Sequence, residues 1–319
     1  MNRGTRVGLS RGQRRPAIFS IREDDAVVDD KDGSPTASQR PTDEYWDRIV
    51  SGTAGDDHRR QTVVRSRLFE HEAERYDRCR PRYPDVVIDA LLGPEPTGLE
   101  VLDVGCGTGI AAVPMVERGA KVLGVDLAPR MAEIAHRHGI EVEIGAFEEW
   151  DAAGRSFDRV TSAQAWHWLD MPAATAKAVS LLRPNGSLGL IWSGGAHPDD
   201  LADALEKVYS TVVPLATHRL FRGYAAHRST DIRTGLDGVV EAIAATPDFG
   251  AVTEEWFPWT QRYQKDEWLE LLLTNSQYPA LDANLRQRLL DAVGTTIDDY
   301  GGSFVMSFET VLFTATRLG

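Results

Sequence analysis

Short apolar runs alternate with amphipathic segments from residue 99 onward. The apolar runs predict strands over 99–105, 121–126, 141–147, 157–164 and 187–192, and the segments between them predict helices over 109–119, 129–139 and 172–182. Gly119 and Gly139 fall where left-handed helix stops are expected, and Pro129 suits a first helical turn. This alternation is typical of right-handed parallel βαβ units.

The pattern changes after Gly195. A helical stretch places Leu201, Leu205 and Val208 on one face, and a polar linker follows it. Residues 249–264 predict a sixth strand, two amphipathic helices come next, and 303–317 closes the chain as an alternating strand. Upstream, a charged helix ends before Pro81 and a second one begins at Pro84.

The chain divides accordingly. Residues 1–62 lack apolar periodicity and are expected to form a disordered extension, while 63–319 form one domain. Within that domain we expect a cofactor-binding core over 97–195, a helical insertion or acceptor cap over 196–250, and C-terminal strands and helices over 251–319 that complete the sheet.

Composition narrows the function classes. The 319 residues carry a formal net charge of -13, which disfavours nucleic acid as a partner. With only Cys79 and Cys106, no disulfide framework is expected. The absence of a membrane-length apolar run and of a secretory signal predicts a cytoplasmic protein without a membrane partner. The sequence carries no signal for an oligomeric state.

The run VLDVGCGTGI, residues 101–110, holds the strongest motif. Gly107, Gly109 and Ala112 satisfy a dinucleotide-binding fingerprint, and Asp126 lies at the end of the next strand, where an acid binds ribose hydroxyls. These residues alone leave a nicotinamide or flavin enzyme open. Asp126 as a plain helix cap is the structural alternative.

Asp103 points to a different ligand. A carboxylate two residues before the first glycine is poorly placed for a pyrophosphate and well placed for an ammonium group. The turn also contains an additional glycine, Gly105, and no second glycine-rich half follows the fifth strand. Together these features favour a cofactor with an amino-acid tail.

Residues 65–319 resemble a class I S-adenosylmethionine-dependent methyltransferase of the methyltransferase-11 type. The resemblance is carried, in order, by YDRCRPRYP, VLDVGCGTG, VLGVD, FDRVTSAQAWHWLD and LLRPNGSLGLIW. It implies an α/β, Rossmann-like fold with a seven-stranded, mostly parallel sheet, an antiparallel last strand, helices on both faces and a helical insertion after strand five. It also implies methyl transfer from S-adenosylmethionine to a small or medium organic acceptor, giving S-adenosylhomocysteine without a metal.

The same resemblance assigns cofactor contacts. Asp103 would reach the cofactor amino group, Asp126 the ribose hydroxyls, Met131 the adenine, and Arg80 the methionine carboxylate. The complete implied set is Tyr76, Arg80, Asp103, Gly105, Cys106, Gly107, Gly109, Asp126, Leu127, Met131, Phe147, Glu148 and Gln164. Ala146 and Ala128 depart from the residues usual at their positions. Tyr76 and Arg80 are equally consistent with an exposed helix end.

The acceptor side is expected after strand four and in the sixth strand. His167 is the candidate general base, flanked by Trp166 and Trp168, and its alternative is a structural hydrogen bond. Trp256, Trp259 and Tyr263 are candidates for an aromatic wall, with core packing as their alternative. Two other functions stay open: an NAD(P)-dependent oxidoreductase and a catalytically silent S-adenosylmethionine-binding regulatory protein.

Overall fold

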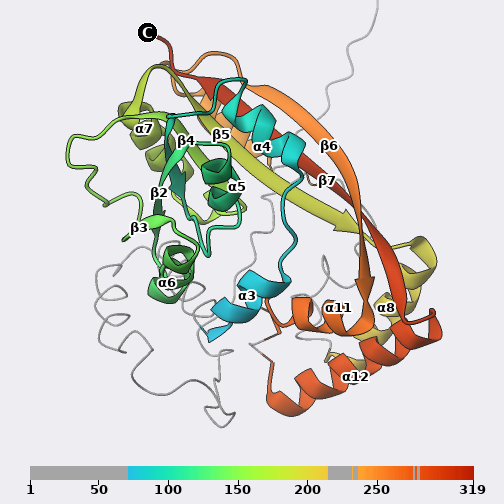
Figure 1. Ribbon diagram of the computed structural model, residues 1–319. Helices are drawn as coiled ribbons and strands as arrows, with labels where there is room; N and C mark the ends of the chain where they lie inside the picture. Colours follow the sequence, from blue (N-terminus) through green and yellow to red (C-terminus); the bar gives the residue numbers. More distant parts are fainter. Residues whose placement is uncertain (1–70, 215–231, 233–235, 276, 279–280) are drawn as a thin grey trace, which may run out of the picture.

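A computed structural model describes residues 71–214, 232, 236–275, 277–278 and 281–319. Its single seven-stranded sheet has the order β3-β2-β1-β4-β5-β7-β6 (Figure 1). The strands are β1 (Glu100–Val104), β2 (Lys121–Asp126), β3 (Glu141–Ile144), β4 (Phe157–Ala163), β5 (Leu182–Ala196), β6 (Thr253–Gln264) and β7 (Ser303–Thr316). Strands β1 to β5 are parallel and β7 runs antiparallel to both neighbours, so the expected sheet is confirmed.

The described helices cover both faces of the sheet. They are α3 (Ala73–Cys79), α4 (Asp85–Leu92), α5 (Ala112–Glu117), α6 (Pro129–Arg137), α7 (Met171–Leu181), α8 (Asp199–Val212), α10 (Asp237–Ala244), α11 (Lys265–Leu272) and α12 (Ala283–Asp299). Helices α4 and α5 pack with Ile191 and Leu312 on one face. Helices α7 and α10 bury Trp192 and Phe313 on the other.

Three strands extend beyond the rest of the sheet. Strands β5, β6 and β7 contain 15, 12 and 14 residues, whereas β1 to β4 contain 4 to 7. Helices α8, α11 and α12 pack on this extension around Tyr263, Phe304 and Phe308, and they form a separate apolar core. We call these helices and the strand ends beneath them the C-terminal lobe (Figure 1).

The predicted insertion 196–250 does not behave as one unit in its described part. Helix α8 packs against α12 in the C-terminal lobe, whereas α10 packs against α7 on the opposite face. Residues 215–231 and 233–235, like the expected extension 1–62, lie outside the described residues. No helix in the described ranges is long and apolar enough to cross a membrane.

One local prediction was wrong. The sequence RPNG at 183–186 predicts a turn, but these residues belong to β5. The pairing with β4 shifts register between Phe157 and Arg159, and Asn185 takes a φ of +65°. A bulge of this kind accommodates the turn-forming residues without ending the strand.

Candidate functional site

The glycine turn follows β1 directly, and its glycines have positive φ angles. Gly105 has a φ of +68°, and a Cβ atom there would lie 2.5 Å from the Cβ of Ala165. Gly107 and Gly109 have φ values of +56° and +88°. Since L-residues with side chains rarely adopt this region, the turn requires glycine and leaves its backbone open for a close approach.

Asp126, at the end of β2, is bound to that turn. Its Oδ2 accepts the Gly107 N–H at 2.8 Å, and its Oδ1 accepts the Ala128 N–H at 2.8 Å. Burial raises the pKa of the Asp126 carboxyl, and hydrogen bonds from the amides of Ala128, Gly107 and Leu127 oppose the rise. A carboxylate has about four lone-pair sites, so the three amide donors still leave room for a hydroxyl donor.

Asp103, on β1, is 1% exposed. Its Oδ1 accepts a hydrogen bond from the Thr161 hydroxyl at 3.0 Å, and its Oδ2 is buried without a partner among the described residues. Burial raises the pKa of Asp103 to about 7, the Thr161 hydrogen bond opposes this rise, and Asp126 adds to it. A buried carboxylate with an open oxygen is suited to a cationic donor such as an ammonium group.

Arg80 follows α3 and reaches toward the C-terminal lobe. Its guanidinium carbon lies 4.9 Å from the centre of the Tyr76 ring. Its Nη2 donates to the Thr274 carbonyl at 2.9 Å and to Asn275 Oδ1 at 2.8 Å. Its Nε is buried and has no partner among the described residues. A donor is therefore available for an anionic group.

Tyr83 joins this end of the site and was not singled out from the sequence, although it lies in the run YDRCRPRYP. Burial raises the pKa of its phenol, Tyr76 and Asp103 add to the rise, and Arg80 opposes it. The charges of Asp103 and Arg80 thus both affect the pKa of Tyr83. An acid and a guanidinium that both act on one phenol are suited to a zwitterion.

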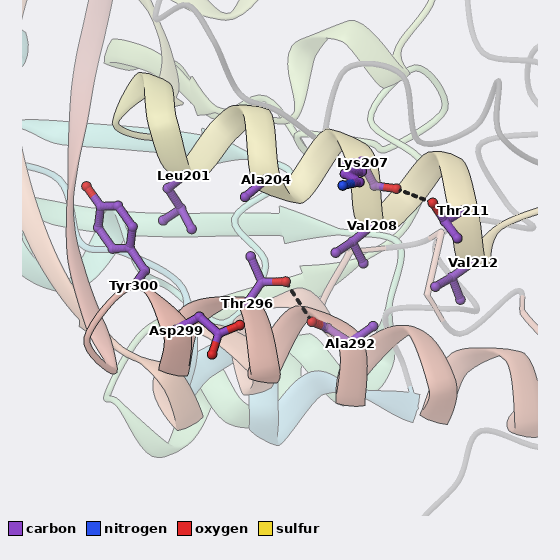
Figure 2. A pocket seen from close by; sticks show the side chains of 10 residues that line it. All are labelled: Leu201, Ala204, Lys207, Val208, Thr211, Val212, Ala292, Thr296, Asp299 and Tyr300. Atoms are coloured by element: carbon purple, nitrogen blue, oxygen red, sulfur yellow. Dashed lines mark hydrogen bonds between the residues drawn. The ribbon is translucent and has the colours of Figure 1, made fainter.

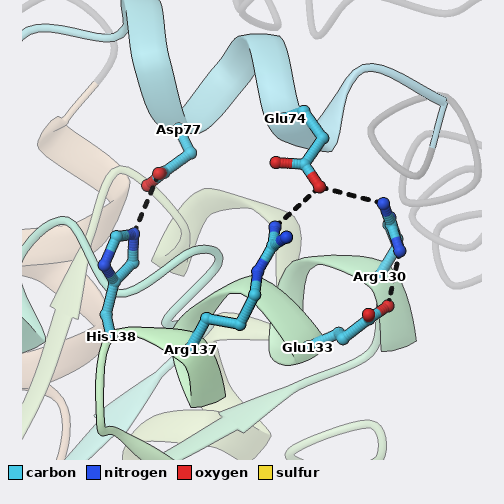
Figure 3. A network of polar contacts seen from close by, with 6 residues as sticks. All are labelled: Glu74, Asp77, Arg130, Glu133, Arg137 and His138. Atoms are coloured by element: carbon cyan, nitrogen blue, oxygen red, sulfur yellow. Dashed lines mark hydrogen bonds and ion pairs between the residues drawn. The ribbon is translucent and has the colours of Figure 1, made fainter.

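Helix α3 connects the core to the lobe. On its core side, Glu74 binds Arg130 at 2.9 Å and Arg137 at 2.6 Å, and Asp77 binds His138 at 2.9 Å, all on or next to α6 (Figure 3). On its lobe side the ion pairs are those of Arg75 and Arg78 with Glu270, at 3.0 and 2.9 Å. Ion pairs on both sides hold α3 between α6 and α11 (Figure 1).

Met131 and Cys106 pack around the turn. Met131 is 5% exposed and packs in a cluster that also contacts Tyr76. A Cβ at Gly107 would lie 3.9 Å from its Cε. Burial raises the pKa of the Cys106 thiol well above its usual range, which agrees with a packing role rather than a nucleophile.

Two residues expected at the adenine edge make structural contacts. Phe147 is 2% exposed and lies in the main core, with its ring 6.0 Å from that of Trp166. Glu148 Oε1 accepts the Asp170 N–H at 3.0 Å, just before α7. Contacts of Phe147 and Glu148 with the adenine stay a prediction.

The segment after β4 sends its side chains to different places. Gln164 has a φ of +58°, and its Nε2 donates to the Ser193 carbonyl at 2.7 Å. Trp166 is 0% exposed in the core, so it offers no surface to an acceptor. His167 is exposed, accepts at Nδ1 from Trp192, and lies with its ring 4.4 Å from that of the half-buried Trp168.

The expected aromatic wall is divided between the two faces of the sheet. Trp256 packs toward the core that α7 and α10 cover, whereas Trp259 packs in the lobe, as the odd spacing along β6 requires. Trp259 stacks on Phe308 at 4.2 Å with an interplanar angle of 11°. Its Nε1 donates to Thr310 Oγ1 at 2.9 Å. A single wall containing both tryptophans is therefore excluded.

A groove of about 520 Å³ lies elsewhere, between α8 and α12 (Figure 2). Leu201, Val208 and Val212 face Thr296 and Tyr300 across it. It shares no residue with the glycine turn or with the α3–α4 linker, so it is separate from the site. The described side chains also include no group of three or more His, Cys, Asp or Glu residues that could hold a metal ion.

The chain is similar to known methyltransferases. Residues 101–186 match the family model described as a methyltransferase domain. An uncharacterized methyltransferase from Mycobacterium tuberculosis H37Rv is 30% identical over 220 residues, which cover 68% of this chain and 80% of that protein. A Dictyostelium discoideum protein assigned as a methyltransferase is 35% identical over 187 residues, covering 56% of this chain and 70% of that protein.

One solved structure shows the same fold. A protein assigned to the type II methyltransferases, from Anaeromyxobacter dehalogenans, superposes with a TM-score of 0.52 and is 22% identical. The match covers 75% of this chain and 98% of that one. A match over this share of both chains shows that the fold is shared.

Proposed function

Since this chain belongs to the class I S-adenosylmethionine-dependent methyltransferases, we propose that it transfers the methyl group to a small organic acceptor from a cofactor held between the glycine turn and Arg80. The observation that carries the cofactor placement is the open, buried Oδ2 of Asp103. A nicotinamide pyrophosphate would put negative charge near this carboxylate, so the arrangement favours a zwitterionic amino-acid tail.

The residues present fit the cofactor. Asp103 would accept from its ammonium group, Asp126 would hold the ribose hydroxyls, and Arg80 would bind the carboxylate. Gly105 and Gly107 leave the turn without side chains where the cofactor has to approach closely. Met131 would border the adenine, and Tyr76, beside Arg80, would close the methionine end. Gln164, Leu127 and Phe147 would add further contacts.

The cofactor supplies a methyl group on a sulfonium, which a nucleophile displaces in line. The chain then has to exclude water and align the acceptor rather than provide a covalent group. Helix α3 would exclude water from the cofactor, because its ion pairs hold it between α6 and α11. A general base contributes only if the acceptor is a hydroxyl or another weakly acidic group.

The proposed acceptor surface is the shelf made by Trp259 and Phe308. Thr310 accepts from Trp259 and donates to Ser193 Oγ at 3.0 Å, so this shelf is fixed across three strands. It belongs to the same lobe that holds Arg80. The net charge of -13 speaks against a polyanionic acceptor and supports a small molecule over a nucleic acid.

The test combines binding with label transfer. Calorimetric titration with S-adenosylhomocysteine should show saturable binding to the wild-type chain, and Asp126→Ala should remove it. Asp158→Asn is the control, because Asp158 lies near the start of β4, whereas Asp126 lies at the end of the parallel strand β2. Labelled methyl groups should enter a panel of small hydroxyl, amine and carboxylate compounds rather than transfer RNA or DNA. Undiminished binding by Asp126→Ala, or label in nucleic acid alone, would contradict the proposal.

A further inference from the structure

Tyr263, near the end of β6, contains a buried polar atom that the fold does not use. The residue is 2% exposed, and its hydroxyl has no hydrogen-bond partner among the described residues. Most buried polar side-chain atoms have a partner, so an unsatisfied one calls for an explanation. A ligand that binds beside it would provide one.

The surroundings of Tyr263 connect it to Arg80. Its ring packs edge to face against Trp268 of α11, with centroids 5.1 Å apart. The turn that follows α11 contains Thr274 and Asn275, which accept hydrogen bonds from Arg80. Tyr263 therefore packs against α11 from β6, and Arg80, in the linker after α3, binds the turn that follows the same helix.

The charge of Arg80 also reaches the phenol. Burial raises the pKa of Tyr263, and the Arg80 guanidinium opposes this rise. Arg80 itself retains a buried Nε without a partner among the described residues. Two unused donors, one of them cationic, are thus available at the junction of the lobe and the linker. Donors of this kind match the oxygens of a carboxylate.

Another tyrosine in the same lobe shows how a purely structural phenol is satisfied. Tyr209, on α8, is 2% exposed, and its hydroxyl is hydrogen-bonded to that of Tyr278. Burial raises the pKa of Tyr209 to about 12. Equal burial therefore does not require an unpaired hydroxyl in this lobe, and the unpaired state of Tyr263 is specific to its position.

We propose that Tyr263 donates a hydrogen bond to the carboxylate at the methionine end of the cofactor, beside Arg80. This inference rests on the proposed function. It assigns a cofactor contact to the C-terminal lobe, outside the 101–186 segment that matches the family model. Tyr263 then contacts the cofactor directly: it holds the carboxylate of the amino-acid tail, while Asp103 holds the ammonium group on the same carbon.

The experiment compares two ligands that differ by the carboxylate. S-adenosylhomocysteine and its decarboxylated analogue are titrated calorimetrically into the full chain, as wild type, Tyr263→Phe and Tyr209→Phe. We expect Tyr263→Phe to weaken S-adenosylhomocysteine about tenfold, as for a hydrogen bond to a charged group, and to change the affinity for the analogue by less than about twofold. Tyr209→Phe should leave both affinities unchanged.

Thermal unfolding of the ligand-free variants separates this role from a structural one. Tyr263→Phe removes a buried hydroxyl without a partner, so its melting temperature should equal or exceed that of the wild type. Tyr209→Phe breaks a buried pair and should lower the melting temperature. A loss of stability in Tyr263→Phe as large as in Tyr209→Phe would overturn the inference.

The other outcomes are equally decisive. Unchanged affinity of Tyr263→Phe for S-adenosylhomocysteine, or an equal loss for both ligands, would overturn the role of Tyr263 while leaving the proposed function intact. Failure of the wild-type chain to bind either ligand would instead refute the proposed function. A loss confined to the carboxylate-bearing ligand supports the inference.

Discussion

The indole Nε1 of Trp192 donates a hydrogen bond to Nδ1 of His167 over 3.1 Å. An indole nitrogen can only donate, so Nδ1 has to be the unprotonated nitrogen of a neutral imidazole. The proton of His167 then lies on Nε2, which becomes a donor. This arrangement opposes the expected role of His167 as a general base and is compatible with a structural or donating role.

Exchange of His167 for glutamine distinguishes the two roles. The Gln amide nitrogen can take the place of Nε2–H as a donor but cannot act as a base. We expect His167→Gln to retain turnover within about threefold, because the loss of a true general base would cost roughly 10²–10⁴-fold. The measurement is turnover of a hydroxyl acceptor under saturating cofactor. An equally large loss of turnover in His167→Gln and His167→Ala would instead support His167 as the general base.

Local sequence determines the first five strands and the glycine turn. The alternating apolar runs and helix stops such as Gly139 are signals that depend only on residues close together in the sequence, and they predict the βαβ order. The extension of β5 to Ala196 left no such signal, because SGGA at 193–196 has little apolar character. These residues are in the sheet because β7 pairs with them, from Ser193 opposite Thr310 to Ala196 opposite Ser307.

The site divides in the same way. Asp103 and Asp126 lie at strand ends whose positions follow from local pattern. Trp166 lies in a motif that predicts a site, yet its burial depends on the packing of α7, which the motif does not encode. Tyr83 lies three residues after Arg80, within the run YDRCRPRYP, so the sequence itself places these two residues close together. Tyr263 comes near Arg80 only through the C-terminal lobe, nearly two hundred residues further along the chain, and only the tertiary structure could reveal it.

Gly105→Ala tests the close approach at the turn. The new Cβ would lie 2.5 Å from the Cβ of Ala165, which is a clash. The new alanine would also have to keep the positive φ of Gly105, so we expect backbone strain as well. Gly139→Ala is the matched control, because Gly139 has a φ of +83° with nothing within 4 Å of the added Cβ. The free energy of unfolding, from urea denaturation, should fall by about 1–2 kcal/mol in Gly139→Ala and by about 1–3 kcal/mol more in Gly105→Ala.

Binding completes that comparison. Gly139→Ala should bind S-adenosylhomocysteine as the wild type does, because Gly139 ends α6 away from the turn. Gly105→Ala should bind it at least about tenfold more weakly, since a shift of the turn misplaces the adjoining backbone. Equal stability and affinity in the two variants would show that the turn at Gly105 tolerates a side chain beside Ala165, contrary to this prediction.

The raised pKa of Asp103 predicts proton-linked cofactor binding. With a pKa of about 7 in the ligand-free chain, the carboxyl is partly protonated near neutral pH. An ammonium group favours the ionised form, so binding should release a proton. The affinity for S-adenosylhomocysteine should therefore rise about tenfold from pH 6 to pH 8 and level off above that range.

Calorimetry in buffers of different ionisation enthalpy measures the protons released. About half a proton should leave per ligand at pH 7, since that is the fraction bound when pH equals pKa. Asp103→Asn should bind weakly with a flat profile between pH 6 and 8, because the amide has no proton to lose. The sign is set by the direction of the shift: a carboxyl with its usual low pKa would already be ionised at pH 6 and would release none. A profile in Asp103→Asn that matches the wild type would place the linked proton on another group.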